Sequence, residues 1–221
     1  SKLDPEVARS AYHLGKDARD WKVKLAQQDL LDSGLDKQKI IPLFYRPFDQ
    51  RYTYYSGKDC GFHCRPRREI MRHILGGTNL SLIYTRSMTA KKPFTHIFCT
   101  QHGIIARFYP DASCVPYFSP LYLYPETDLF NHPQEPRPKE PNLNPRVLAK
   151  LSQTYQTSPA PETTFNYIYA VLYSNTYRTK YAEFLQSDFP RLPFTKDYDL
   201  FRQLGEYGHR LVDLHLLKST E

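Results

Sequence analysis

The sequence lacks any run of about 18 apolar residues, and no secretory or transit segment opens it. A transmembrane helix needs about 20 consecutive apolar residues, so no membrane span is predicted. Only four cysteines occur among 221 residues, which, without a signal segment, favours a reducing cytoplasm over a disulfide framework. The chain starts at Ser1 and not at methionine, which suggests a piece of a longer protein.

The sequence also lacks the motifs of several enzyme classes. It contains no Asn-Pro-Pro-Tyr/Phe, with which adenine methyltransferases hold a flipped base, no Gly-rich turn after a strand, and no GxxxxGK[ST] loop. Pro110-Asp111 is not followed by Asp/Glu-x-Lys within a strand's reach. No catalytic residue is therefore predicted, and a self-contained nuclease or RNA-processing enzyme is the least favoured function.

Positive charge is present in excess, and the excess is local. The chain has 30 Lys and Arg residues against 23 Asp and Glu. Ten of the basic residues fall in one window: Arg46, Arg51, Lys58, Arg65, Arg67, Arg68, Arg72, Arg86, Lys91 and Lys92. Only Asp49, Asp59 and Glu69 oppose them, so this window holds the whole net charge of +7. Such a patch is typical of a protein that binds phosphate or nucleic acid.

A helix is predicted over residues 65–75, with Pro66 near its first position and Gly76-Gly77 at its end. At 100° per residue, Arg65, Arg68 and Arg72 share one face. Cations at a helix N-terminus are unfavourable unless an anion binds there. The pattern therefore favours a phosphate site, the alternative being a solvated face whose arginines pair with acidic residues elsewhere.

The chain divides by pattern into a β-rich first half and a helical second half, which predicts an α+β fold. Helices are expected at 4–14 and 17–33, the second capped by Asp17. Strands are expected at 40–45, 51–55, 79–86, 94–100, 104–109 and 121–124, in a mixed sheet with flanking helices. The strand at 40–45 contains Pro42, which suggests an edge or a strand end, and 79–86 alternates as if one face were buried.

Residues 125–145 are rich in proline and read as an extended surface linker. We divide the chain into a sheet-containing recognition part at 1–124, a proline-rich linker with a short helix at 125–160, and a helical part at 161–221. The helical part is expected to pack on the first part or on a neighbouring module. His73 is expected to cap helix carbonyls, and His215 to be a satisfied core histidine.

The cysteines allow a zinc hypothesis. Cys60 and Cys64 with His63 between them, together with Cys99 and His102, could supply ligands. However, the spacing is looser than in the usual zinc knuckle, and Cys99 falls in a predicted strand. Buried free cysteines behaving as small apolar residues are favoured, and no metal site is predicted.

Several segments in series resemble one known family. They are YRPFDxRxxYY at 45–55, GFHCRPR at 61–67, NLSLIYTR at 79–86, PLYLYP at 120–125, FPRLP at 189–193 and LVDLHL at 211–216. In order and spacing they resemble the C-terminal specificity (target-recognition) domain of type ISP restriction-modification enzymes, over most of the chain.

The resemblance implies that the chain binds double-stranded DNA and positions methyltransferase and helicase-nuclease modules of the same polypeptide. It implies no cofactor within this chain, whereas S-adenosylmethionine, ATP and Mg²⁺ would belong to the missing adenine-N6 methyltransferase, helicase and nuclease modules. The alternative is a protein–protein docking domain, in which the helical half binds a neighbour and the basic patch has only non-specific DNA affinity.

The candidate DNA-binding residues divide by chemistry. Phosphate contacts are expected from Arg65, Arg67, Arg68, Arg72, Lys91 and Lys92. Forked or amide side chains suit base edges, and Arg86, Gln101, His102 and Arg107 qualify by type. Arg51 is also a DNA-binding candidate, although with Tyr54 and Tyr55 it could instead contact the methyltransferase. Arg46, which lies between apolar residues, is expected to lock the corner by pairing locally.

Overall fold

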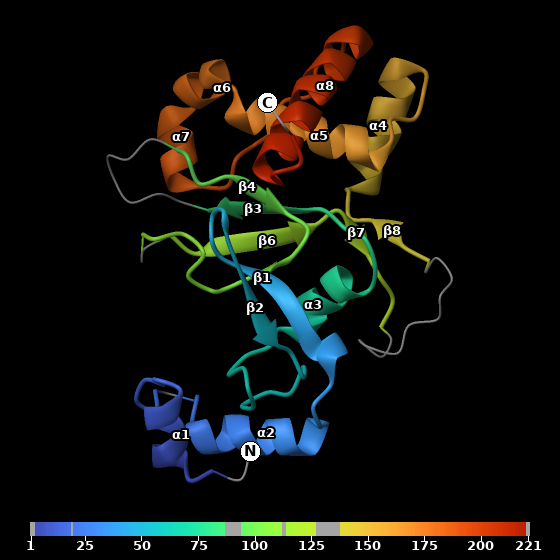
Figure 1. Ribbon diagram of the computed structural model, residues 1–221. Coiled ribbons are helices and arrows are strands. Elements are labelled where there is room, and N and C mark those ends of the chain that lie inside the picture. Colours follow the sequence, from blue (N-terminus) through green and yellow to red (C-terminus); the bar gives the residue numbers. More distant parts are fainter. Residues whose placement is uncertain (1–2, 19, 87–93, 112–113, 127–137, 220–221) are drawn as a thin grey trace.

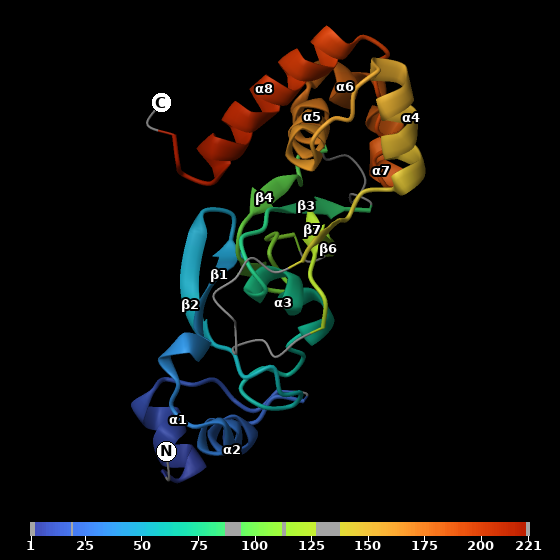
Figure 2. The same ribbon diagram turned by 90° about the vertical axis from the view of Figure 1, so that its right-hand side faces the viewer.

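The computed structural model describes residues 3–18, 20–86, 94–111, 114–126 and 138–219. The predicted α+β class is confirmed. Figures 1 and 2 show three tiers: two short helices at the N-terminal end, strands in the middle, and a group of helices from the C-terminal half at the other end. No helix among the described residues is long and apolar enough to cross a membrane.

The helices are α1 (Pro5–Ala11), α2 (Val23–Ser33), the 3-10 turn η1 (Lys37–Lys39), α3 (Arg68–Leu75), α4 (Pro145–Tyr155), α5 (Pro161–Tyr173), α6 (Asn175–Lys180), α7 (Ala182–Ser187) and α8 (Tyr198–His215). The strands are β1 (Ile40–Arg46), β2 (Asp49–Tyr54), β3 (Ser81–Thr85), β4 (Phe98–Thr100), β5 (Gly103–Ile104), β6 (Pro116–Pro120), β7 (Tyr122–Leu123) and β8 (Glu140–Pro141).

The strands form three small sheets. One has the order β2-β1-β5 and is mixed, because β5 runs parallel to β1 while β2 runs antiparallel to it. The second, β4-β3-β6, is antiparallel, and β7 pairs with β8. Of the two positions that Pro42 suggested, an edge strand or a strand end, the edge is wrong, and Pro42 is the third residue of β1. β1 is the central strand, but β5 pairs only with Leu43 and Phe44, so Pro42 has a partner on the β2 side alone.

Other strand predictions also differ from the structure. The strand expected at 94–100 covers only Phe98–Thr100. The strand expected at 104–109 is only two residues long. β6 was not predicted because a proline stands at each end of it. β8 falls within the proline-rich segment and pairs with Tyr122 and Leu123, so that end of the segment belongs to a sheet.

The β4-β3-β6 sheet is covered on both faces. Only one buried face was expected for β3. Ser81, Ile83 and Thr85 are at most 1% exposed, so the more polar face of the strand is the more deeply buried. Leu82 and Tyr84, on the opposite face, line an apolar pocket together with side chains of α5. Alternation identified the strand but could not show that helices cover its second side.

One hydrophobic core joins the two halves of the chain. Ile83 and Phe98 belong to the same buried cluster as Tyr169, Phe201 and Val212 of the C-terminal helices. The Tyr173 hydroxyl also donates a hydrogen bond to the Ile97 carbonyl, 2.6 Å away. The helical part thus packs on the sheet within this chain, whereas the division at 124 and 160 stays a prediction.

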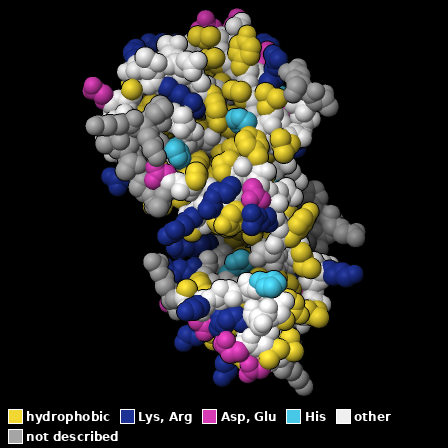
Figure 3. All heavy atoms as spheres, turned by 60° about the vertical axis from the view of Figure 1, so that its left-hand side comes forward, with side chains coloured by type: hydrophobic (Ala, Val, Ile, Leu, Met, Phe, Trp, Pro, Cys, Tyr) yellow, Lys and Arg dark blue, Asp and Glu magenta, His cyan; other side chains and the backbone are white. Residues whose placement is uncertain are grey.

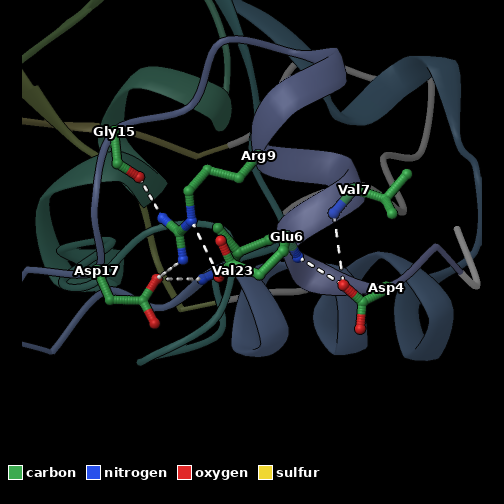
Figure 4. Close-up of polar contacts among 7 residues, drawn as sticks. All are labelled: Asp4, Glu6, Val7, Arg9, Gly15, Asp17 and Val23. Carbon is green, nitrogen blue, oxygen red and sulfur yellow. Dashed lines mark hydrogen bonds and ion pairs between the residues drawn. The ribbon is translucent and has the colours of Figure 1, made fainter.

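The N-terminal helices are tied together by a polar cluster (Figure 4). Arg9 of α1 contacts the Asp17 carboxylate at 2.9 Å and the Gly15 carbonyl. Asp17 also accepts the Val23 amide at 3.1 Å, and these bonds hold the pKa of Asp17 below its usual range. The prediction that Asp17 caps α2 is wrong. It satisfies the first helical amide from six residues away, and Lys22 occupies the cap position.

The α5–α8 contact gives the first testable prediction. A methyl group on Gly208 would lie 1.8 Å from the Asn166 carbonyl oxygen of α5, so Gly208→Ala must push the helices apart. We expect destabilisation of about 1–3 kcal/mol or more, measured by urea unfolding. Gly15→Ala is the control, because nothing lies within 4 Å of its added methyl group. Equal stability of the two variants would contradict this packing.

Candidate nucleic-acid interface

The arginine-rich segment forms a shorter helix than predicted. α3 begins at Arg68, and Arg67 precedes it in the left-handed region with φ of 51°. Pro66 lies outside the helix, where its carbonyl accepts a 2.9 Å hydrogen bond from the buried Tyr55 hydroxyl. The expectation that Arg65 shares the helical face is therefore wrong. Arg68 and Arg72 remain one turn apart on α3.

The arginines of this segment make mainly weak, exposed ion pairs. Arg65 lies 3.3 Å from Asp20, and Arg67 lies 3.7 Å from Glu69. Arg72 lies 3.8 Å from Glu126, whereas Arg68 is exposed and has no hydrogen-bond or ion-pair partner among the described residues. Because exposed pairs contribute about 0–1 kcal/mol each, an incoming phosphate could displace them at little cost.

The prediction that His73 caps the carbonyls of α3 is wrong. It is 5% exposed, and its Nδ1 accepts the Tyr124 amide at 2.9 Å. Burial and the neighbouring Arg72 lower the pKa of His73, so the ring is neutral at pH 7 and serves as a structural acceptor.

The β1–β2 turn is fixed by two arginines. Arg46 has a structural role, as predicted, but its partners are backbone carbonyls and not the acidic side chain of the corner: it donates to Tyr45 at 2.8 Å and to the distant Arg107 at 2.5 Å. Arg51 pairs with Asp49 at 2.8 Å. Both guanidinium groups lie over the Tyr45 ring, 4.4 Å and 3.9 Å from its centroid.

The remaining sequence candidates differ in exposure. Arg107 is exposed, and no partner for its guanidinium occurs among the described residues. His102 is half-buried against Phe44, and burial lowers its pKa, so it is neutral at pH 7. Gln101 is also half-buried, beside it in the loop. Arg86 is exposed and lies 3.6 Å from Asp188. Lys91 and Lys92 lie outside the described residues.

Figure 3 shows Lys and Arg side chains gathered across the waist of one face, where the surface is hollowed. The Arg46–Arg107 bond brings the end of β1 and the segment after β5 together. Gly103 of β5 approaches Met71 of α3, because an added methyl group would lie 3.0 Å from its sulfur. Two segments of the basic window, β1 and α3, thus both lie next to the 103–107 segment, which carries Arg107.

The histidines and cysteines fill structural positions. No group of three or more potential metal ligands occurs among the described residues. Cys60 is exposed, whereas Cys99 is fully buried in β4, and burial raises its pKa to about 12. His215 is half-buried, shares a hydrogen bond with the Tyr169 hydroxyl and stacks on Phe98, as expected for a core histidine.

The fold is a small α+β module with Lys and Arg side chains gathered on the face that Figure 3 shows, and comparison with known proteins identifies its family. The chain belongs to the Type ISP C-terminal specificity domain family, which matches residues 1–221. No curated protein matches the chain.

Solved structures contain the same fold. The chain is similar to part of DrdV in the cryo-EM structure of a DrdV–DNA complex, with 27% identity, a TM-score of 0.63, and 83% of this chain and 16% of that chain covered. It also resembles the ATP-dependent Type ISP restriction-modification enzyme LlaBIII bound to DNA, with 21% identity, a TM-score of 0.65, and 92% and 12% covered. A third similar structure is that of a nuclease-deletion mutant of the Type ISP enzyme LlaGI in complex with a DNA substrate mimic. The identity is 22%, the TM-score is 0.52, and 83% of this chain and 14% of that chain are covered. The chain thus spans 12% to 16% of these solved chains.

The placement of the cysteines predicts their reactivity. At pH 8, a disulfide reagent should modify the exposed Cys60 within minutes. Cys99 should react only after unfolding, because a thiol with a pKa of about 12 is roughly one part in ten thousand thiolate at that pH. Cys60→Ser should remove the fast phase, as followed by absorbance. Four equally fast thiols would contradict the structure.

Proposed function

We propose that this chain recognises a short DNA sequence on behalf of a larger restriction-modification enzyme. The observation that carries the proposal is that a chain of the Type ISP specificity-domain family holds its whole net positive charge in one window, between Arg46 and Lys92. Figure 3 also shows Lys and Arg side chains gathered on one face of the molecule. That DrdV and LlaBIII are bound to DNA in their solved structures supports it.

The proposed contacts divide into two kinds. Arg65, Arg67, Arg68, Arg72, Lys91 and Lys92 contact phosphates and fix the register. Arg51, Arg86, Gln101, His102 and Arg107 are the candidates for base edges. The partners are methyltransferase and helicase modules of the same cytoplasmic polypeptide. These modules, and not this chain, would use S-adenosylmethionine, ATP and Mg²⁺.

Selection from random duplex DNA at near-physiological salt tests the function. It is run with this chain and, in parallel, with the complete enzyme that we propose contains it. A motif enriched by both means that the chain itself reads sequence. A motif enriched only by the enzyme means that a neighbouring module must close around the DNA. No motif with either contradicts sequence recognition.

Exposed apolar residues favour one alternative, a docking domain. Leu200, Tyr207 and Leu217 at the C-terminal end are 42%, 60% and 69% exposed. A domain that only docks, through α8 and the residues after it, would bind DNA in a salt-sensitive and sequence-independent way. The selection would then return no motif.

The role of α3 has its own test. Arg68→Ala combined with Arg72→Ala should weaken binding to all sequences about equally and lower the salt slope by roughly one per lost phosphate contact. Binding is measured by fluorescence anisotropy between about 50 and 200 mM salt. Arg146→Ala combined with Lys150→Ala, two exposed cations of α4, is the charge-matched control. An unchanged slope in the α3 variant would remove that helix from the DNA surface.

A further inference from the structure

The Arg51 guanidinium is held on one edge and on one face. Its Nε donates to Asp49 Oδ1 at 3.0 Å and its Nη2 to Asp49 Oδ2 at 2.8 Å. Its Cζ lies 3.9 Å from the centroid of the Tyr45 ring. A two-point ion pair and a stacked ring together fix the plane of a guanidinium. We call Tyr45, Asp49 and Arg51 the Arg51 unit.

This arrangement leaves a defined set of donors free. A guanidinium has five N–H groups, and Asp49 takes two of them on the Nε side. The Nη1 and Nη2 hydrogens at the far end have no partner among the described residues, and the Arg51 side chain is 56% exposed. This end is the edge with which arginine donates two parallel hydrogen bonds to guanine O6 and N7.

Asp49 distinguishes a base contact from a phosphate contact. Its carboxylate is 38% exposed, and the bond from Arg51 keeps the pKa of Asp49 below its usual range, so it is ionised at neutral pH. A negative charge beside Arg51 opposes an approaching phosphate, since like charges repel. The same charge is compatible with a base edge, where it orients the arginine.

The turn of the hairpin that carries the Arg51 unit is held in place by contacts of Phe48 and Arg46. Phe48 has φ of 63°, an unfavourable conformation for a bulky residue, and its ring packs edge-on against Phe98 with centroids 5.0 Å apart. Arg46 fastens the same turn to the Arg107 carbonyl. A two-stranded antiparallel ribbon such as β1–β2 is one of the shapes that the major groove admits.

We propose that the Arg51 unit reads one guanine in the major groove, with Arg51 as the specificity-determining residue and Asp49 and Tyr45 as positioning residues. The inference rests on the proposed function and adds to it the base and the atoms. A good bidentate contact corresponds to roughly ten- to a hundredfold preference for the correct base.

The test compares Arg51→Lys and Asp49→Asn with the unchanged chain in a selection from random duplex DNA, followed by affinities for single-base variants of the enriched motif. Arg51→Lys keeps the charge but loses the fork. Asp49→Asn keeps the size but loses the charge that orients it. Both should lose the preference for guanine at the same single position, roughly ten- to a hundredfold, with preference elsewhere retained. Arg202→Lys, in the exposed Arg202–Glu206 pair of α8, is the control and should change nothing.

The alternatives give different results. For a phosphate contact, Arg51→Lys would leave every preference intact and Asp49→Asn would strengthen binding to all sequences alike. For a purely structural pair, neither variant would change selectivity, and only the unfolding temperature would fall. Either result, with a motif still enriched by the unchanged chain, overturns this inference alone. If the unchanged chain enriches no motif, the proposed function fails with it. Thermal unfolding of each variant shows whether it folds. If one of Arg51→Lys and Asp49→Asn does not fold, the selectivity of the other variant decides between these results.

Discussion

The contact between Phe98 and His215 links the recognition face to the C-terminal helices. These rings, on β4 and at the end of α8, stack with centroids 5.7 Å apart. Phe48, at the tip of the β1–β2 turn, packs edge-on against both, at 5.0 Å and 5.9 Å. Three residues that are distant in sequence thus form one aromatic cluster. The position of the turn that precedes Arg51 of β2 therefore depends on packing against both β4 and α8.

This dependence explains why a binding surface needs so large a helical part. A hairpin alone is marginally stable in water, and a loosely held arginine would lose conformational entropy on each contact it made. Side chains of α5 pack against Leu82 and Tyr84 of β3, and Phe98 of β4 contacts both Phe108 and His215 of α8. The helical part therefore supports the sheet from which the β1–β2 hairpin is held.

Electrostatics sets the complementary constraint. Most arginines of the basic window make ion pairs of little energetic value, whereas Arg68 in the window and Arg107 outside it have none among the described residues. Such a surface repels itself in the free protein and gains stability when an anion binds, as RT ln(1 + [L]/Kd) requires. The excess charge is thus compatible with a folded chain because the core supplies the stability.

Sequence reasoning succeeded where the signal was local. The expected end of the second helix at residue 33 and the expected start of the helical part at residue 161 agree with the bounds of α2 and α5, and both follow from short-range chemistry. It failed where a distant partner decides the outcome. The Tyr55 hydroxyl donates a hydrogen bond to the Pro66 carbonyl, and Pro66 stays outside α3. The Tyr124 amide donates to a ring nitrogen of His73. Both faces of β3 are covered. At the candidate site, sequence could suggest a local pair at the corner, but not the edge-specific Asp49–Arg51 bond or the stack on Tyr45.

The measurement that tests the account most directly is backbone hydrogen exchange of this chain with and without duplex DNA that carries its selected motif. If the β1–β2 hairpin faces DNA, exchange should slow at the β1–β2 turn, in residues 101–107 and at the start of α3, with the outer surface of α4 unchanged. Protection confined to α4 and α8, with none at the turn, would place DNA on the other side of the molecule and contradict the account.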